Sequence, residues 1–233
     1  MPNTIGSLDL YAKAEDLLGV KEAAPALYAH YLLFLKSIEF DSLLDVGCGS
    51  GDFLRQMQGA LGISEVKGID LSPLMVARTL EQGYEAECIN LCDLKGNYTV
   101  ITAVFDMLNY LNREALQTFF ACVEAHLDPG GYFLCDINTL YGFENVAVGA
   151  YIVDDDTRFL TVDSDFEHGE YLSEFTLFEK EGRCFEKSQE TIRQYYHTVE
   201  DIAGLSGLEL RVNDEVNLYG LEAPDKQFLV FQK

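Results

Sequence analysis

Residues 43–53 read LLDVGCGSGDF, in which a short apolar run leads directly into three alternating glycines. Leu43, Leu44 and Val46 form the kind of apolar run that is found in a strand buried on both faces. The glycines allow the chain to turn sharply and to bring backbone N–H groups against a ligand, because no Cβ stands in the way. Apolar residues then recur with helical spacing over residues 52–61, so the ligand would lie at the N-terminus of a helix.

The spacing of the glycines distinguishes between ligands. A dinucleotide fingerprint is G-x-G-x-x-G/A, whereas this loop is G-x-G-x-G, and Asp52 stands where the last glycine of the fingerprint would fall. Asp45 adds a carboxylate at the end of the strand, which would repel a pyrophosphate but attract a cationic ammonium or sulfonium group. The alternative is an ordinary glycine-rich turn between a strand and a helix, without a ligand.

The rest of the chain repeats the strand–helix alternation. Four further strands are predicted at 65–71, 86–91, 98–105 and 132–137, with a helix that begins after Ser72 and another over 113–126. Five strands alternating with helices predict an α/β fold with a doubly wound parallel sheet. Ligands bind outside the carboxyl ends of the strands in such sheets, so the residues after each strand are the candidates for the site.

The two ends of the chain and one internal segment have other patterns. Residues 8–18 and 23–37 have apolar faces with helical spacing, and residues 208–212 and 228–231 read as two final strands. From about residue 150 to residue 197 the apolar residues alternate with period two, with turn signals between the runs. We interpret this segment as an antiparallel sheet inserted after the fifth strand, built from the runs 158–166, 171–179 and 184–196.

The charge balance excludes several kinds of partner. Sixteen Lys and Arg against 39 Asp and Glu give a formal net charge of −23, which disfavours binding of nucleic acid and of an anionic membrane surface. The sequence has no signal-like N-terminus and no apolar run long enough to span a bilayer, so we expect a cytoplasmic protein. The six cysteines lack zinc-site spacing, and we expect no bound metal and six reduced thiols.

These features together resemble class I S-adenosylmethionine (SAM)-dependent methyltransferases over nearly the whole chain. Within that class, FDMLNYL and DINT, followed by a β-rich insertion, are similar to a bacterial small-molecule branch that includes relatives of sugar-amine and glycine N-methyltransferases. The matching segments are LLDVGCGSG (43–51), GIDLS (68–72), LCDL (91–94), VFDMLNYL (104–111) and LDPGGYFLCDINT (127–139).

The resemblance implies an architecture. It predicts a Rossmann-like, mostly parallel seven-stranded sheet with an antiparallel terminal strand. It also divides the chain into an N-terminal helical lid (1–37), a SAM-binding domain (38–145 and 198–233), and an inserted antiparallel β subdomain (146–197) that covers the substrate.

By position, the resemblance also implies the residues that hold the cofactor. An acid at the end of the second strand can accept both ribose hydroxyls, which is the role an acidic residue has there in nucleotide-binding folds. Simple turn chemistry is the alternative for Asp70, solvation for Asp93, and core packing for a tyrosine of the N-terminal helices. The implied contacts are Asp45, Gly47, Cys48, Gly49, Gly51 and Phe105 with the methionine portion, Asp70 with the ribose, Leu71, Asp93 and Leu94 with the adenine, and Tyr28 from the lid.

The segment after the fourth strand is predicted to face the methyl group. Asp106 could orient or deprotonate an amine, Tyr110 could offer its ring to a cation, and Asn109 lies between them. The alternative is that Asp106 caps a turn and Tyr110 packs into the core. On the strand 184–196 only one parity can face the pocket. We favour the face that carries Arg193 and Tyr195, and the alternative is the face that carries Gln194 and Tyr196.

The sequence therefore predicts a SAM-dependent methyltransferase that releases S-adenosyl-L-homocysteine and acts on a small polar acceptor, with nitrogen favoured over oxygen. The alternatives are a methyltransferase for a macromolecule such as tRNA or protein, and a SAM-binding protein without catalysis. The oligomeric state stays open, with a homodimer as one alternative.

Overall fold

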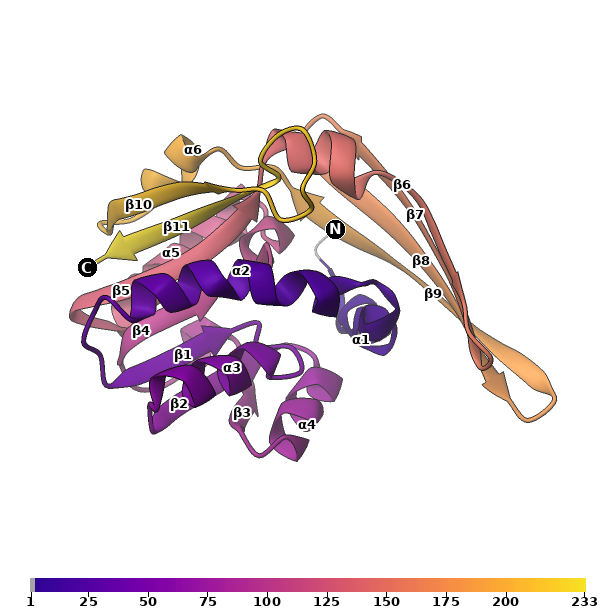
Figure 1. Cartoon of the computed structure of the whole chain (residues 1–233), viewed down its shortest axis with the longest axis horizontal. Helices are drawn as coiled ribbons and strands as arrows, with labels where there is room; N and C mark the ends of the chain where they lie inside the picture. Colours follow the sequence, from indigo (N-terminus) through magenta and orange to yellow (C-terminus); the bar gives the residue numbers. More distant parts are fainter. Residues whose placement is uncertain (1–2) are drawn as a thin grey trace.

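The computed structural model describes residues 3–233, so Met1 and Pro2 of the expected lid lie outside the described residues. A seven-stranded sheet forms the main body, and a second, four-stranded sheet projects from it as a long arm (Figure 1). The strands of the main sheet are β1 (Ser42–Val46), β2 (Glu65–Asp70), β3 (Glu85–Cys88), β4 (Tyr98–Ala103), β5 (Leu127–Asn138), β10 (Glu209–Val216) and β11 (Lys226–Gln232).

The order of the main sheet confirms the predicted doubly wound fold. The order is β10-β11-β5-β4-β1-β2-β3, and β1 through β5 pair in parallel. The terminal strand β11 is antiparallel, as predicted, and lies between β5 and β10. Because the chain winds outward from β1 in both directions, the carboxyl ends of β1, β2 and β4 meet at one edge, where ligands of such sheets bind.

Helices cover both faces of the main sheet. One core joins α2 (Val20–Leu35) and α3 (Asp52–Leu61) to the sheet, and the other core lies under α5 (Arg113–His126) and α6 (Val199–Ala203). The helix α4 (Pro73–Glu81) contacts β2 and β3, and its N-cap is the predicted Ser72, whose hydroxyl accepts from the backbone N–H of Met75. These helices leave the carboxyl edge of the central strands open for a site.

The inserted sheet is made of β6 (Gly149–Asp154), β7 (Arg158–Glu167), β8 (Glu170–Glu181) and β9 (Cys184–Tyr195), all antiparallel. His168 and Gly169 form the two-residue turn between β7 and β8 with positive φ at both positions, which matches the right-handed twist of a hairpin. The sequence reading missed β6. The predicted fourth strand was also too long, because the chain leaves the sheet after Ala103 and adopts positive φ at Phe105 and Asp106.

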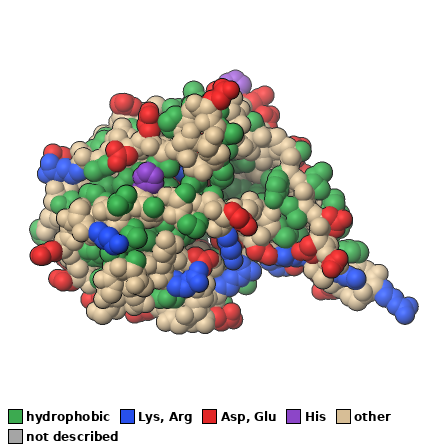
Figure 2. All heavy atoms as spheres, in the orientation of Figure 1, with side chains coloured by type: hydrophobic (Ala, Val, Ile, Leu, Met, Phe, Trp, Pro, Cys, Tyr) green, Lys and Arg blue, Asp and Glu red, His purple; other side chains and the backbone are tan. Residues whose placement is uncertain are grey.

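The helix α1 (Ile5–Ala14) and the short turn η1 (Glu15–Leu17) lie between the main body and the arm (Figure 1). Toward the arm, Leu10 and Ala14 pack in a core with β7, β8 and β9. Toward the body, the Ser72 hydroxyl donates to Asp9 at 2.6 Å, and Arg78 donates to the carbonyl of Ala12. Figure 2 shows that hydrophobic side chains border the hollow where the body meets the arm.

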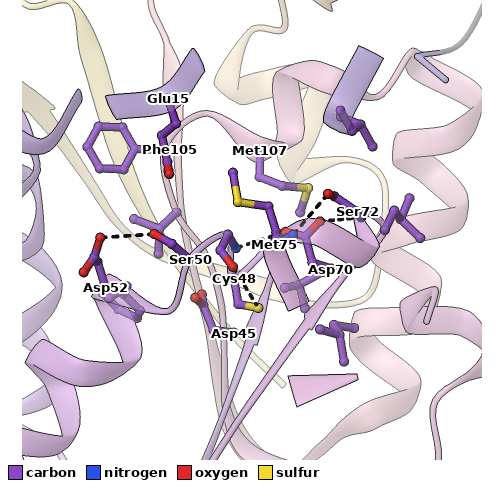
Figure 3. Close-up of a pocket in the computed structure, with 18 of the residues that line it drawn as sticks. Glu15, Asp45, Cys48, Ser50, Asp52, Asp70, Ser72, Met75, Phe105 and Met107 are labelled. Atoms are coloured by element: carbon purple, nitrogen blue, oxygen red, sulfur yellow. Dashed lines mark hydrogen bonds between the residues drawn. The ribbon is translucent and has the colours of Figure 1, made fainter. Parts of the chain in front are cut away.

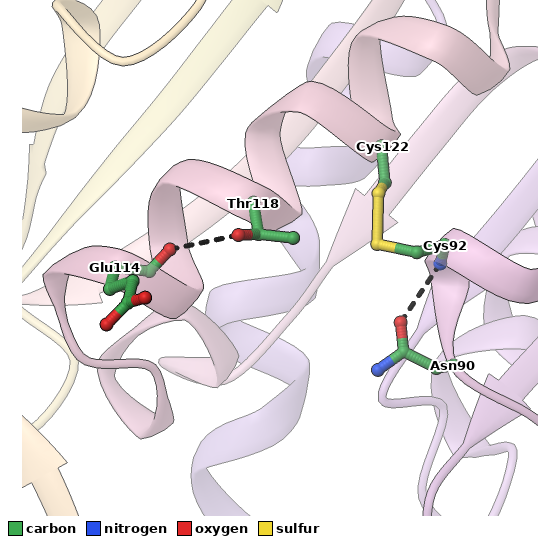
Figure 4. The surroundings of a disulfide bond; sticks show 5 residues. All are labelled: Asn90, Cys92, Glu114, Thr118 and Cys122. Carbon is green, nitrogen blue, oxygen red and sulfur yellow. Dashed lines mark hydrogen bonds between the residues drawn. A yellow bond between two sulfur atoms is a disulfide. The ribbon is translucent and has the colours of Figure 1, made fainter.

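The cysteines require a correction. Cys92, in the short helix η2 (Leu91–Asp93), and Cys122, in α5, form a disulfide (Figure 4). The prediction of six reduced thiols is therefore wrong for this pair, since the fold brings together two residues that are distant in sequence. Cys48, Cys88, Cys135 and Cys184 are free.

Among residues 3–233, no helix combines the length and the apolar character that a membrane span requires. Within the same residues, no group of three or more His, Cys, Asp and Glu side chains is arranged to hold a metal ion.

Candidate functional site

The glycine loop between β1 and α3 has the backbone that its sequence predicts. Gly47, Gly49 and Gly51 all have positive φ, and the N–H groups of Gly47 and Cys48 donate to the carbonyl of Ile69 on the neighbouring strand. A Cβ on Gly47 would lie 2.8 Å from Cγ of Met107, so the loop packs closely on the segment after β4. Only glycine allows both this conformation and this approach.

A cavity of ≈ 610 Å³ lies over the loop, at the carboxyl ends of the central strands. Its volume falls in the range of small-molecule and cofactor sites. The cavity lies under the N-terminal helices, and Figure 3 shows Glu15 pointing into it from η1 and Asp45 lying on the side of the glycine loop. Of the residues predicted from sequence, the cavity brings together Tyr28, Asp45, Gly47, Cys48, Gly49, Asp70, Leu71, Phe105 and Tyr110.

Asp70 is fixed by the backbone around it. One carboxylate oxygen accepts from the N–H of Gly49 at 3.0 Å, and the other accepts from the N–H of Ser72 at 2.8 Å. Partial burial raises the pKa of Asp70, and these backbone bonds work against the increase. Each oxygen keeps a second acceptor position, so the carboxylate can still accept a hydroxyl at each oxygen.

Two further carboxylates give the cavity an acidic character. Asp45 is 2% exposed, and burial raises its pKa to about 7 although the Thr102 hydroxyl donates to it. Glu15 faces the loop from η1, with an oxygen 3.9 Å from where a Cβ on Gly49 would lie, and burial raises its pKa too. A carboxylate that burial makes costly to ionise is stabilised by a cationic ligand.

Aromatic side chains close one side of the cavity. The ring of Tyr28 meets those of Phe53 and Phe105 edge to face, with centroids 5.1 and 5.8 Å apart. Burial raises the pKa of Tyr28 and Tyr110 above the ordinary value, so both phenols stay protonated. Protonated phenols beside carboxylates can donate a hydrogen bond or present a ring face to a cation.

Three predicted cofactor residues lie outside the lining of this cavity. Gly51 lies beneath the loop, where a Cβ would lie 3.0 Å from the side chain of Thr79. Asp93 is exposed and Leu94 is buried in the core under α5. Ile89, Asn90 and Leu91 line the cavity at this edge instead.

Asn109 has a different surrounding from the one predicted. It is fully buried in η3 (Met107–Tyr110), its amide donates to the carbonyl of Tyr195, and its oxygen accepts from the N–H of Asn138. Both ends of the side chain therefore join η3 to β9 and β5. We leave Asn109 out of the acceptor site for this reason.

The preferred face of β9 requires a correction. Arg193 pairs with Glu170 on the far side of the strand, and Tyr195 lines a separate cavity of ≈ 290 Å³. The opposite parity faces the site, because the amide of Gln194 donates to Asp106 at 2.6 Å. The alternation in sequence showed that one face must turn inward but not which one.

Three residues of this region were missed in the sequence: Glu15, Asp136 and Lys226. Lys226 is buried at the start of β11, and its ammonium lies 2.5 Å from Asp106 and 3.3 Å from Asp136. The signal for it in the sequence was a lysine two residues before the apolar run 228–231. Glu15 had no local signal, because its neighbours in space come from distant segments.

The comparisons with known proteins agree with this geometry. Residues 43–131 match the model of a methyltransferase domain. This range runs from β1 through the glycine loop, β2, β3, β4 and α5 to the first residues of β5. No curated protein sequence matches the chain.

Solved structures share the fold over nearly the full length. An S-adenosylmethionine-dependent methyltransferase from Clostridium acetobutylicum is 21% identical with a TM-score of 0.77, over 96% of this chain and 98% of that one. A sugar N-methyltransferase from Streptoalloteichus is 16% identical with a TM-score of 0.75, over 100% and 96%. A SAM-bound amino pentose methyltransferase from Micromonospora echinaspora is 20% identical with a TM-score of 0.63, over 99% and 92%.

Proposed function

We propose that this chain is a class I SAM-dependent methyltransferase that transfers the methyl group to a nitrogen of a small polar acceptor. The match of residues 43–131 to a methyltransferase domain supports the proposal. The observation that carries the acceptor proposal is the carboxylate of Asp106, which follows the cavity residue Phe105 in the chain and lies near three tyrosines. Burial raises the pKa of Tyr11, Tyr110 and Tyr219, and the charge of Asp106 raises each of them further. An anionic group among ring faces suits an amine that arrives as a cation.

The residues of the cavity fit SAM. The loop brings bare backbone to the ligand, Asp70 has acceptor capacity for two hydroxyls, and Leu71 with Leu91 offers apolar surface at the adenine end. Asp45 and Glu15 would hold the ammonium group and compensate the sulfonium charge. When bound, SAM supplies an electrophilic methyl group on a positively charged sulfur.

The contribution of the protein is mainly orientation. Holding a nucleophile in line with a leaving group can contribute about 7–11 kcal/mol where the geometry is favourable. An amine that arrives protonated must also lose its proton, and Asp106 is the carboxylate at hand. A positioned base typically adds roughly 10²–10⁴-fold to the rate.

The fold neighbours support a small acceptor. Two of the structures compared above are a sugar N-methyltransferase and an amino pentose methyltransferase, and both align with this chain over more than nine-tenths of their length. The net charge of −23 favours a small amine over a polyanion such as tRNA.

The test is incubation with methyl-labelled SAM and a panel of amino sugars, simple amines and hydroxy acids, with products identified by mass spectrometry. We expect N-methyl products with higher kcat/KM than any O-methyl product. Labelled products only from the hydroxy acids would make the assignment to nitrogen wrong. SAM binding without labelled product from any panel member, from protein or from tRNA would favour a non-catalytic SAM-binding protein.

A further inference from the structure

Lys226 joins three side chains at the edge of the site. Its side chain is 3% exposed, and its ammonium donates to Asp106 at 2.5 Å and to the side-chain oxygen of Asn138 at 2.9 Å. The same nitrogen lies 3.3 Å from a carboxylate oxygen of Asp136. A lysine so deeply buried is costly unless such partners compensate its charge.

Asp136 holds the backbone that carries Asp106. Its two oxygens accept from the N–H groups of Phe105 and Asp106, at 2.7 and 2.8 Å, and the hydroxyl of Tyr31 donates to it at 2.7 Å. Phe105 and Asp106 have φ of 58° and 48°, a conformation that is uncommon outside glycine and that must be held by its surroundings. The result is a sharp turn after β4, in which the Phe105 ring lines the cavity and the Asp106 side chain points to Lys226 and Gln194.

Lys226 supplies the positive charge between the two carboxylates of this cluster. Asp136 is fully buried and Asp106 has an 18% exposed side chain, so two carboxylates share one ammonium. Burial lowers the pKa of Lys226, but Asp106 and Asp136 raise it by more, so the amine stays protonated. Without that charge the two carboxylates would repel each other at the turn.

Asp106 is held from two sides. Lys226 occupies one carboxylate oxygen and the amide of Gln194 occupies the other. Each oxygen keeps an acceptor position, and the carboxylate is still partly exposed. The cluster therefore orients Asp106 without using up its capacity for a further partner.

We propose that Lys226 is a positioning residue for methyl transfer, which holds the carboxylate of Asp106 correctly directed for contact with the acceptor amine. The inference rests on the proposed function, because Asp106 must face the acceptor for its position to matter. Lys226 itself acts only through Asp106.

A double-mutant cycle on the full-length chain tests this. Lys226→Met and Asp106→Asn should each lower kcat/KM for the amine acceptor by about 10–100-fold, while the Kd for SAM changes less than about threefold. In the Asp106→Asn background, Lys226→Met should lower kcat/KM by less than about threefold further, because residues that act as a unit are not additive. Additive losses, or a wild-type kcat/KM in Lys226→Met, would overturn the proposal.

A variant that conserves the charge of Lys226 supports the interpretation of the cycle. Lys226→Arg keeps the charge between the carboxylates and is expected to fold even where Lys226→Met does not. The kcat/KM of Lys226→Arg should be at least about fivefold higher than that of Lys226→Met. If Lys226→Met does not fold, the kcat/KM of Lys226→Arg should lie between those of wild type and Asp106→Asn. A Lys226→Arg enzyme with kcat/KM below that of Asp106→Asn would contradict an action through Asp106.

Lys67 provides the matched control. It is also a strand lysine paired with two carboxylates, Glu85 and Glu87, but it lies on β2 away from the cavity lining. Lys67→Met should leave kcat/KM for the acceptor within about twofold of wild type. Absence of methyl transfer by the wild-type chain would count against the proposed function itself, whereas wild-type transfer without coupling in the cycle would count only against the role of Lys226.

Discussion

The hydroxyl of Thr102 on β4 donates a hydrogen bond of 2.7 Å to the carboxylate of Asp45 on β1, beneath the glycine loop. This bond lowers the cost of ionising Asp45, but burial has the larger effect, and with the nearby charge of Asp70 it raises the pKa to about 7. The carboxylate that we assign to the SAM ammonium group is therefore half protonated near neutral pH in the protein without ligand.

Cofactor binding should depend on pH for this reason. Below pH about 7, Asp45 must lose a proton before it can pair with an ammonium group, so the Kd for SAM should rise towards tenfold per pH unit. Above pH about 8 the α-amino group of the ligand loses its own proton, and the affinity should fall again. Calorimetry between pH 5.5 and 9 checks this as a bell-shaped profile. Asp45→Asn should lack the acidic limb, and an unchanged acidic limb in that variant would refute the assignment.

The stability of the ligand-free protein should also depend on the protonation of Asp45. Rising pH favours cofactor binding through this group, but it lowers the contribution of Asp45 to stability. The folded pKa of Asp45 is raised above the unfolded value of about 3.9, so folding retains a proton that the unfolded chain releases. The contribution of Asp45 to stability therefore falls as pH rises from about 4 to about 7 and is constant above that. We expect the unfolding free energy of Asp45→Asn, relative to wild type, to increase over this range and then level off in denaturant titrations. A difference that does not vary with pH would contradict the raised pKa.

Asp70 is expected to dominate recognition of the ribose. Asp70→Asn should raise the Kd for SAM about 10–100-fold, because hydrogen bonds to a charged group contribute about 1.5–3 kcal/mol. Asp93→Asn is the control, since this exposed carboxylate lies outside the cavity lining and the change should alter the Kd by less than about threefold. A loss of SAM affinity in Asp93→Asn equal to that in Asp70→Asn would instead support the contact between Asp93 and the adenine that the resemblance implies.

The disulfide should stabilise the fold. It closes a loop between residues 30 apart, for which the chain-entropy model gives about 3–4 kcal/mol. Reduction, or Cys122→Ser, should lower the unfolding free energy by up to this amount in urea titrations. Cys184→Ser, which alters an exposed free thiol at the start of β9, should have no effect. A wild-type protein whose stability is insensitive to reductant would refute a contribution from the disulfide.

The features that sequence could predict are those encoded locally. The strand Ser42–Val46, the glycine loop and the cap at Ser72 each depend on a few adjacent residues, and the structure has them as predicted. The inward parity of β9 depends on which way the whole inserted sheet faces, and alternation alone is symmetric in that respect. The prediction that the face with Arg193 and Tyr195 turns inward was wrong for this reason.

The cluster around Asp106 could not be predicted for a related reason. Lys226, Asp136 and Gln194 lie far apart in sequence, and they meet because β11 enters the sheet beside β5 while β9 returns from the arm. The disulfide has the same origin, since Cys92 and Cys122 meet only where η2 packs against α5. Local patterns identify the cradle for the cofactor, and the tertiary fold assembles the acceptor side.

The most direct test of the central claim is isothermal titration calorimetry of the purified chain with SAM, S-adenosyl-L-homocysteine, ATP and NADH at pH 7.5. The account predicts one binding site per chain for the two sulfur nucleosides, and no measurable heat with ATP or NADH, whose phosphates would face Asp45 and Glu15. Binding of ATP or NADH with no heat from SAM would contradict it.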